Sequence, residues 1–257
     1  MLLDFADTVN VLEGRYVTAE DVGTSARDMA LLRKETKWVS GLSRRQGGSG
    51  DPSPFTALGV EAAMRACAQR RFGSRDLKGR TVAVVGRGHV GSQLARRLAR
   101  AGARVIAGDI NPDKRKTVQE LDGARWADPS TALLAEVDVL APCALGSAID
   151  EVTVRKVRCQ IVCGAANNQL AHEGLADDLA ARGILFAPDY IANAGGLINI
   201  SIELEGYDPK VARQRVAQIE QTMGQILDEA EAAGITPLAA ANDHARRRLA
   251  AAAGPPR

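Results

Sequence analysis

The sequence predicts an α/β fold built on a doubly wound parallel sheet, and three observations lead to it. Short runs of continuous apolar residues, of which "RTVAVVG" is the clearest, recur along the chain, and such strands are buried on both faces. Helical stretches separate these runs, which favours parallel strands joined by crossover helices. The composition, 46% hydrophobic and 25% charged over 257 residues, is that of a globular protein with a sizeable core.

The expected elements follow from hydrophobic periodicity and from turn residues. Before the sheet we expect a helix over 1–13, a strand over 15–19 that ends in a glycine turn, a helical or irregular segment over 26–38, a Gly-, Ser- and Pro-rich loop or hinge over 43–54, and a helix over 56–72. The strands are expected over 80–86, 103–109, 137–143, 159–166 and 183–189, with helices over 89–102, 111–123, 208–233 and 236–252.

Composition also narrows the class of protein. The formal charge is +2, from 33 basic and 31 acidic residues, which gives no indication of a nucleic-acid partner. Apolar runs stay well short of the roughly 20 residues that span a bilayer, and the N-terminus lacks the pattern of a signal peptide. We therefore expect a cytoplasmic protein without a membrane partner. The four cysteines lack the spacing of a zinc site, so we interpret them as buried thiols and expect no metal.

A glycine-rich turn follows the first sheet strand and opens a helix. "VAVVGRGHVGSQLA" places Gly86, Gly88 and Gly91 in a GxGxxG pattern, which is weak by itself but strong in this context. The first glycine permits the tight turn, the second lets the backbone approach a pyrophosphate, and the third lets the helix pack on the strand. The helix N-terminus, at His89 and Val90, then offers N–H groups and a positive dipole end to phosphates. The turn therefore predicts a dinucleotide site.

An acidic residue ends the next strand, where such a site needs one. Asp109 can accept hydrogen bonds from a ribose diol, and its charge would repel a 2′-phosphate. NAD is therefore favoured over NADP. Lys114 and Arg115 lie nearby in the sequence and weaken that preference.

Asparagines follow two of the later strands. "GAANNQL" contains Asn167, and "PDYIANAGGLIN" contains Asn193. In an open α/β sheet, ligands bind beyond the carboxyl ends of the strands. Amide groups there can bind a nicotinamide carboxamide or a polar substrate, whereas the alternative is that Asn and Gly only form turns. The presence of both segments favours a binding role.

Six segments stand in order along the chain: "GRYVTAEDVGTS", "GDPSPFTALGV", "TVAVVGRGHVGSQLA", "APCALG", "GAANNQLA" and "PDYIANAGGLINI". Together they resemble the amino-acid dehydrogenases of the glutamate/leucine/phenylalanine/valine type, and the leucine, valine and phenylalanine enzymes most. The resemblance runs from about residue 5 to the C-terminus. It implies a Rossmann fold and the reversible NAD-dependent oxidative deamination of an L-amino acid to a 2-oxo acid and ammonia.

The resemblance also implies roles for single residues. Asp21 resembles the catalytic carboxylate that handles protons around the substrate amine. Thr56 resembles a threonine near the nicotinamide ribose. Asn167 resembles an asparagine beside the nicotinamide and the substrate, and Asn193 resembles the asparagine of the last strand end that contacts the cofactor.

The substrate pocket is implied in the same way. Leu197 and Ile200, with Ala19 opposite, resemble the residues that hold the substrate side chain. Apolar residues there favour branched-chain or aromatic substrates, because a glutamate side chain would leave its carboxylate unpaired.

The sequence departs from the family in its lysines. The family's first domain carries a "GGGK"-type segment and a second lysine; one lysine grips the substrate carboxylate and the other activates water. The seven lysines here lie outside any such segment. We therefore expect residues 1–42 to be a remnant of the substrate domain, 43–204 the dinucleotide-binding domain, and 205–257 C-terminal helices. Two interpretations stay open: a truncated dehydrogenase whose chain is inactive alone, or a non-catalytic NAD-binding protein.

The same departure has a consequence for stability. Without the neighbouring strands of that domain, we expect residues 15–19 to form an unpaired strand and the segment 1–42 to be poorly held. Subunit contacts in the family run largely through the first domain, so the resemblance leaves open whether the chain forms a homo-oligomer.

Overall fold

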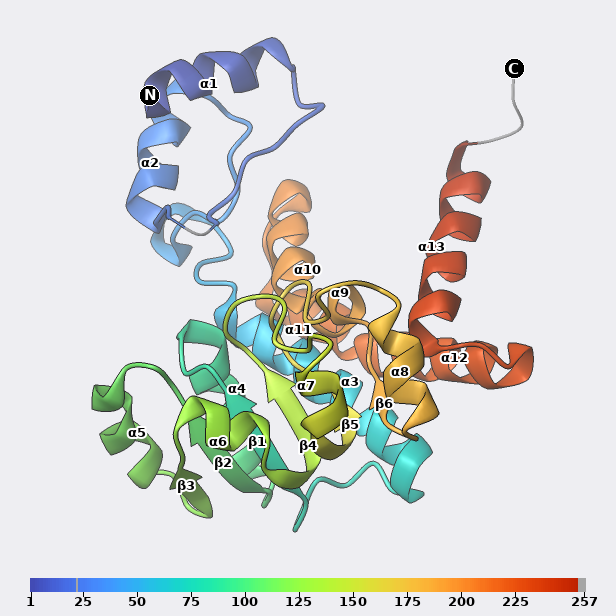
Figure 1. Ribbon diagram of the computed structural model, residues 1–257. Coiled ribbons are helices and arrows are strands. Elements are labelled where there is room, and N and C mark those ends of the chain that lie inside the picture. The colour runs from blue at the N-terminus through green and yellow to red at the C-terminus, as the bar shows by residue number, and fades with distance from the viewer. Residues whose placement is uncertain (22, 254–257) are drawn as a thin grey trace.

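The computed structural model describes residues 1–21 and 23–253 (Figure 1). Its elements are, in order, α1 (Leu2–Val11), α2 (Ala26–Glu35), η1 (Arg44–Gln46), α3 (Ser53–Phe72), β1 (Thr81–Val85), α4 (His89–Arg100), β2 (Arg104–Gly108), η2 (Pro112–Lys114), α5 (Arg115–Gln119), β3 (Ala124–Trp126), α6 (Pro129–Leu133), β4 (Glu136–Pro142), α7 (Thr153–Lys156), β5 (Arg158–Val162), α8 (Leu175–Ala181), β6 (Leu185–Phe186), α9 (Asp189–Ala192), α10 (Gly195–Ser201), η3 (Ile202–Glu205), α11 (Pro209–Ala217), α12 (Ile219–Ala233) and α13 (Pro237–Ala253).

The strands form one sheet in which all neighbours are parallel. Their order is β3-β2-β1-β4-β5-β6, so the chain starts in the middle of the sheet and changes direction between β1 and β4. This is the order of a doubly wound dinucleotide-binding fold, and it confirms the predicted fold class. Val85 of β1 stands opposite Gly108 of β2 and Pro142 of β4. These three strands therefore end at one level, and the loops that follow them meet there.

Helices cover both faces of the sheet. Val82 and Val84 of β1 belong to the apolar core that includes residues of α3, α4 and α12, whereas Ala83 belongs to the core that includes residues of α7 and α8. Alternate residues of a strand point to opposite faces, so burial on both faces explains the continuous apolar runs. Figure 1 shows α6 and α7 on the near side of the sheet and α3 behind it.

Several element bounds differ from the sequence prediction. The helix expected over 111–123 is shorter and consists of η2 and α5; Asn111 caps its start by accepting a hydrogen bond from the N–H of Asp113, and α5 ends at Gln119. The short edge strand β3 was not predicted. The last strand pairs only at Leu185 and Phe186, and the helix expected over 208–233 is divided at Gln218 into α11 and α12.

The segment before α3 has a small core of its own. Its buried apolar residues are Ala6, Met29, Leu32, Val39 and Leu42. The strand expected over 15–19 is reduced to a single parallel bridge between Thr18 and Val39. The prediction of an unpaired strand is therefore wrong, because the N–H of Thr18 donates to Trp38 O at 3.0 Å and the N–H of Ser40 donates to Thr18 O at 2.8 Å.

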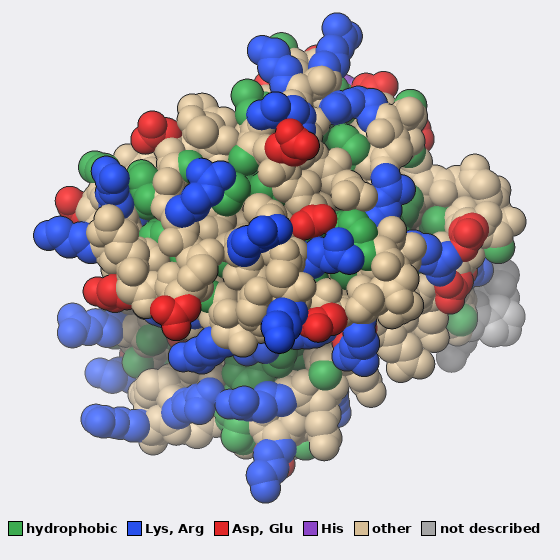
Figure 2. Space-filling model, turned by 90° about the horizontal axis from the view of Figure 1, so that it is seen from below, with side chains coloured by type: hydrophobic (Ala, Val, Ile, Leu, Met, Phe, Trp, Pro, Cys, Tyr) green, Lys and Arg blue, Asp and Glu red, His purple; other side chains and the backbone are tan. Residues whose placement is uncertain are grey.

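The two ends of the sheet differ in character. Lys78, Arg104 and Arg158 are exposed at or beside the amino ends of the strands, and the view from below in Figure 2 shows many Lys and Arg side chains on that face. The carboxyl ends lie toward α10 and the N-terminal segment (Figure 1). Within residues 1–21 and 23–253, none of the helices combines the length and the apolar character needed to cross a membrane.

Candidate functional site

The glycine turn after β1 brings α4 into close contact with the sheet. Gly86 has a φ of +100°, and a Cβ there would stand 2.7 Å from the backbone N of Ala144. A Cβ on Gly91 would stand 2.0 Å from Gly86 O, so only glycine fits at either position. α4 begins at His89 after Gly88, and in the described structure no side chain caps its first N–H groups. A pyrophosphate can accept hydrogen bonds from these groups.

Asp109 reaches across this turn from the end of β2. Its Oδ2 accepts a hydrogen bond from the Arg87 N–H at 2.5 Å, and its Oδ1 accepts one from the Asn111 N–H at 2.8 Å. The carboxylate is half-buried, and each oxygen keeps a further lone pair for a ribose hydroxyl. The structure therefore brings Asp109 to the glycine turn.

Arg87, which was not predicted as a site residue, is buried beside Asp109. Its Nη2 donates to Thr117 Oγ1 at 3.2 Å, while Nε and Nη1 have no hydrogen-bond partner within the described part of the chain. Burial lowers the pKa of the guanidinium, Arg96 lowers it further, and Asp109 raises it. Lys114 Nζ donates to the backbone O of Arg87 at 3.0 Å. The Arg87 guanidinium thus lies beside Asp109 and partly offsets the charge that would repel a 2′-phosphate.

The two predicted asparagines meet beyond the ends of β5 and β6. Asn193 Nδ2 donates to Asn167 Oδ1 at 2.5 Å and to Ala165 O at 3.2 Å. A Cβ on Gly146 would stand 2.9 Å from Asn167 O, so the loop after β4 packs directly against the backbone of Asn167. Asn167 is exposed and Asn193 half-buried, and their amides form one polar surface at the carboxyl edge of the sheet.

Thr56 and the predicted pocket residues lie on two helices in contact. Thr56 stands in the first turn of α3, where its Oγ1 donates to Pro52 O at 3.2 Å. A Cβ on Gly196 of α10 would stand 2.5 Å from this Oγ1, so the two helix starts touch. Leu197 is 73% exposed and Ile200 half-buried. Because these two residues are three positions apart on α10, both can face one ligand.

Glu20, which lies between Ala19 and Asp21, is within electrostatic range of His89 at the start of α4. Burial and the charge of Asp51 raise the pKa of the Glu20 carboxyl, and His89 lowers it. Asp21 is exposed. The Thr24 hydroxyl accepts a hydrogen bond from the backbone N–H of Asp21 at 2.9 Å and donates one to the backbone O of Asp21 at 2.8 Å. Asp21 was the one carboxylate of this segment predicted to be functional; Glu20 beside it is a second carboxylate, and its pKa responds to His89.

The four cysteines are free thiols that lie wholly or partly in the interior. Those the structure describes are all free; Cys67, Cys159 and Cys163 are buried, as predicted, and Cys143 is half-buried. Burial raises the pKa of Cys143 and of Cys159 to about 12. A hydrogen bond with Cys67, and then burial, raise that of Cys163. Protonated thiols are poor nucleophiles and poor metal ligands at neutral pH.

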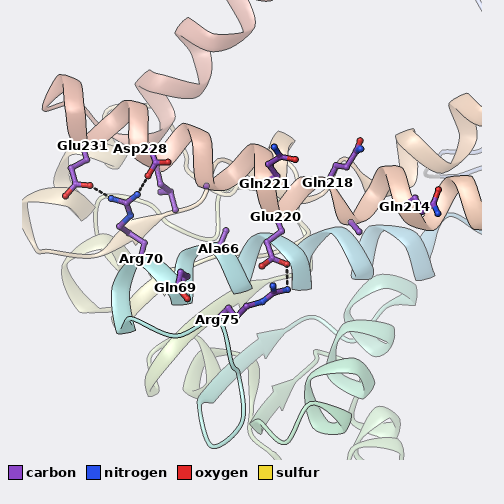
Figure 3. A pocket seen from close by; sticks show the side chains of 13 residues that line it. Ala66, Gln69, Arg70, Arg75, Gln214, Gln218, Glu220, Gln221, Asp228 and Glu231 are labelled. Atoms are coloured by element: carbon purple, nitrogen blue, oxygen red, sulfur yellow. Dashed lines mark hydrogen bonds and ion pairs between the residues drawn. The ribbon is translucent and has the colours of Figure 1, made fainter.

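A groove of about 1010 Å³ lies elsewhere, between α3 and α12 (Figure 3). Arg70 on its wall pairs with Asp228 and Glu231, and Arg75 pairs with Glu220 at 2.9 Å. Arg75 precedes β1, whereas the glycine turn follows β1. The groove therefore lies toward the amino ends of the strands, and its described arginines are already neutralised by carboxylates.

Two models of known protein families match parts of this sequence. The pattern of the family described as glutamate/leucine/phenylalanine/valine dehydrogenase matches residues 109–254. The pattern of the NAD-binding domain of D-isomer specific 2-hydroxyacid dehydrogenases matches residues 59–147, which include the glycine turn and Asp109.

Individual relatives agree with this match. The chain is 44% identical over 255 residues to a valine dehydrogenase of Streptomyces albus, covering 98% of this chain and 70% of the relative. It is 43% identical over 239 residues to a leucine dehydrogenase of Thermoactinomyces intermedius, covering 93% and 65%. The crystal structure of an L-tryptophan dehydrogenase from Nostoc punctiforme matches with a TM-score of 0.85 and 36% identity, over 96% of this chain and 71% of that one. The chain thus spans about two thirds of the length of these proteins.

Proposed function

Because the chain belongs to the glutamate/leucine/phenylalanine/valine dehydrogenase family, we propose that it serves the NAD-dependent oxidative deamination of a branched-chain or aromatic L-amino acid to the 2-oxo acid and ammonia. One observation supports this most: Asn167 and Asn193 are hydrogen-bonded to each other at the same edge of the sheet at which the glycine turn and Asp109 meet. A dinucleotide that spans this edge would have its ribose at Asp109 and its nicotinamide near the asparagines.

The residues of this edge fit NAD. Gly86 and Gly91 let α4 pack closely against the sheet. The N–H groups at the start of α4, at His89 and Val90, carry no side-chain cap in the described structure and can donate to the pyrophosphate. Gly88 is exposed and has no atom within 4 Å of a Cβ position, so the backbone there is accessible. Bound NAD supplies the hydride acceptor. The chain's own residues would orient the NAD, among them Thr56, which lies at the start of α3 against α10 and is proposed to lie near the nicotinamide ribose.

The substrate class follows from the residues that face the nicotinamide end. Leu197, Ile200 and Ala19 offer apolar contacts, and Asp21 is the carboxylate proposed to accept and return protons at the substrate amine. A glutamate side chain would lose its hydration against Leu197 and Ile200 without gaining a cationic partner from them. We therefore place branched-chain and aromatic amino acids ahead of glutamate.

The proposal includes the arrangement of the chain. Residues 1–42 would belong to the substrate domain, 43–204 to the dinucleotide-binding domain and 205–257 to C-terminal helices. The partly exposed apolar side chains of Phe5, Val11 and Leu31 lie on the first of these, and a homo-oligomer would cover them. We also propose a cytoplasmic location, with which the four free cysteines agree.

Replacement of Asp109 tests the cofactor site. Asp109→Ala should weaken NAD binding by about tenfold or more, because a hydrogen bond to a charged group contributes about 1.5–3 kcal/mol. The same change should reduce the discrimination against NADP. Calorimetric titration of both nucleotides measures this, and Asp113→Asn, an exposed neighbour on η2, is the matched control. Unchanged affinities for both nucleotides would remove Asp109 from the site.

Turnover tests the reaction. The purified 257-residue chain is supplied with NAD and with L-valine, L-leucine, L-phenylalanine or L-glutamate, and NADH absorbance is followed. We expect NAD binding without NADH formation, because the resemblance assigns water activation to a lysine of the first domain and none of the seven lysines in this sequence lies in a "GGGK"-type segment. Turnover would show that a group within the chain replaces that lysine. Failure to bind NAD would overturn the proposed function.

A further inference from the structure

A single carboxylate connects the end of α10 to a loop more than 150 positions earlier in the sequence. Glu203, on η3, is half-buried. Its Oε2 accepts hydrogen bonds from the N–H groups of Gly41, at 2.9 Å, and Ser49, at 2.8 Å. Its Oε1 faces the N–H of Leu42 at 3.4 Å. Three backbone donors thus converge on one charged side chain.

The loop over residues 41–50 is shaped to present these donors. The N–H of Gly50 donates to Leu42 O at 2.9 Å and that of Gly48 to Ser43 O at 3.1 Å, so the chain folds back on itself. Gly41 and Gly50 have φ values of +81° and +69°, and a Cβ on Gly48 would stand 2.2 Å from Leu42 O. Successive N–H groups turned to one side in this way form an anion-binding concavity.

The loop is joined directly to the segment that carries the substrate-side carboxylates. Ser40, next to Gly41, donates its N–H to Thr18 O at 2.8 Å. The Cβ position of Gly41 lies 3.5 Å from the N of Glu20. Gly41 therefore lies next to the backbone of Glu20, the residue before Asp21.

The other end of the connection is the helix that carries the pocket. Glu203 follows α10, which bears Leu197 and Ile200 and whose first residues touch α3 at Thr56. Glu203 thus lies between the two halves of the site: the cofactor and pocket residues on one side, and the Asp21 segment on the other.

We propose that Glu203 is a positioning residue, whose carboxylate holds the loop 41–49 and thereby sets the place of Glu20 and Asp21 relative to α10 and the glycine turn. The functional meaning of that placement rests on the proposed function, because the role of Asp21 is part of it. The hydrogen bonds of Glu203 with Gly41 and Ser49 do not depend on the proposed function, since they are contacts within the protein.

Glu203→Gln removes the charge at constant size and replaces one acceptor oxygen by a donor that cannot pair with N–H groups. Hydrogen exchange followed by mass spectrometry measures the result in peptides that cover 15–21 and 38–50. We expect amide exchange in these two peptides to be at least about tenfold faster than in wild type, because a charge-assisted hydrogen bond is lost. Peptides of β1 and β4 should be unchanged. Glu35→Gln, an exposed glutamate of the same segment, is the matched control and should match wild type.

Energy transfer gives a readout that a general loss of stability would not produce. In a Trp126→Phe background, Trp38 is the remaining tryptophan, and it lies in the segment that Glu203 holds. Its transfer to bound NADH reports the distance from that segment to the cofactor. Glu203→Gln should change the transfer efficiency and broaden the distribution of Trp38 lifetimes, while the affinity for NADH stays within about twofold.

The outcomes separate this proposal from the proposed function. Unchanged exchange in both peptides of Glu203→Gln would overturn the positioning role, whether or not NADH binds. Failure of every variant to bind NADH would count against the proposed function and leave the exchange result intact. If Glu203→Gln does not fold, wild-type exchange decides: the amides of Gly41 and Ser49 should exchange far more slowly than that of Gly23, and equal rates would overturn the proposal.

Discussion

Replacement of Gly91 by alanine should separate α4 from β1 and abolish the dinucleotide site. The added Cβ would stand 2.0 Å from Gly86 O and 3.2 Å from the Cβ of Cys143. Ordinary contacts of carbon begin near 3.5 Å, so the helix start would have to move by roughly 1.5 Å from Gly86 O. That movement would also loosen Leu94 and Leu98, which α4 buries against the sheet.

The magnitude follows from the backbone character of the obstacle. Overpacking of a closely packed site costs about 1–3 kcal/mol, occasionally more, and a backbone carbonyl cannot rotate away as a side chain can. We expect about 3 kcal/mol for Gly91→Ala. For a chain of this size, each kcal/mol lowers the melting temperature by about 2–4 °C, so the midpoint should fall by about 6–12 °C.

The matched control is the same substitution at an open position. Gly224 lies in the middle of α12, and a Cβ there would meet no atom within 4 Å. Alanine is favoured over glycine in a helix by about 0.5–1 kcal/mol, so Gly224→Ala should melt at or above the wild-type temperature.

Thermal unfolding and calorimetric titration with NAD measure both variants. We expect Gly91→Ala to lose NAD binding at temperatures at which it is still folded, since the N–H groups at the start of α4 move with the helix. A Gly91→Ala protein that melts within about 1 °C of wild type and binds NAD equally well would refute the packing argument.

Two further predictions concern the titratable groups. Burial, followed by Asp51, raises the pKa of Glu20, so the protonated carboxyl favours the folded state; this contribution is present below the unfolded pKa and is lost as the pH rises through the folded one. Glu20→Gln should therefore melt above wild type at pH 7, and the difference should close below the ordinary pKa of a glutamate, about 4.3. A difference that does not change with pH would contradict this prediction. Because burial raises the pKa of Cys143 and of Cys159 to about 12, iodoacetamide at pH 8 should leave both thiols unlabelled in the native chain and label them in urea; rapid native labelling of either, seen by mass spectrometry, would show an accessible thiolate.

The sheet could be predicted because its signals are local. Val82, Ala83 and Val84 are apolar in succession, and burial on both faces is the condition under which such a run is stable. The sequence could not show the short edge strand β3, since its three residues at the edge of the sheet carry almost no burial pattern. Its pairing with β2 is decided by the sheet that it joins.

The candidate site divides in the same way. Gly86, Gly91 and Asp109 were found from spacing, because the turn, the close helix and the strand end are consecutive in the chain. Arg87 lies between two of these glycines, yet its burial beside Asp109 depends on how η2 and α5 cover the end of β2. That packing leaves no mark on the local periodicity.

The N-terminal segment shows where local reasoning fails. The sequence predicted a strand over residues 15–19 and no adjacent strand with which it could pair. In the structure Thr18 pairs with Val39 and Ser40, which lie some twenty positions later, and the loop after them is held by Glu203.

The sequence by itself determined the doubly wound sheet, the glycine turn and the acid at the next strand end, because hydrophobic periodicity and glycine spacing report conditions that each segment must satisfy alone. Only the tertiary structure decided how Arg87 is buried and what holds the Asp21 segment. Those features depend on hydrogen bonds between segments far apart in the chain, such as Glu203 with Gly41 and Ser49, and such bonds form only when the whole fold brings donor and acceptor together.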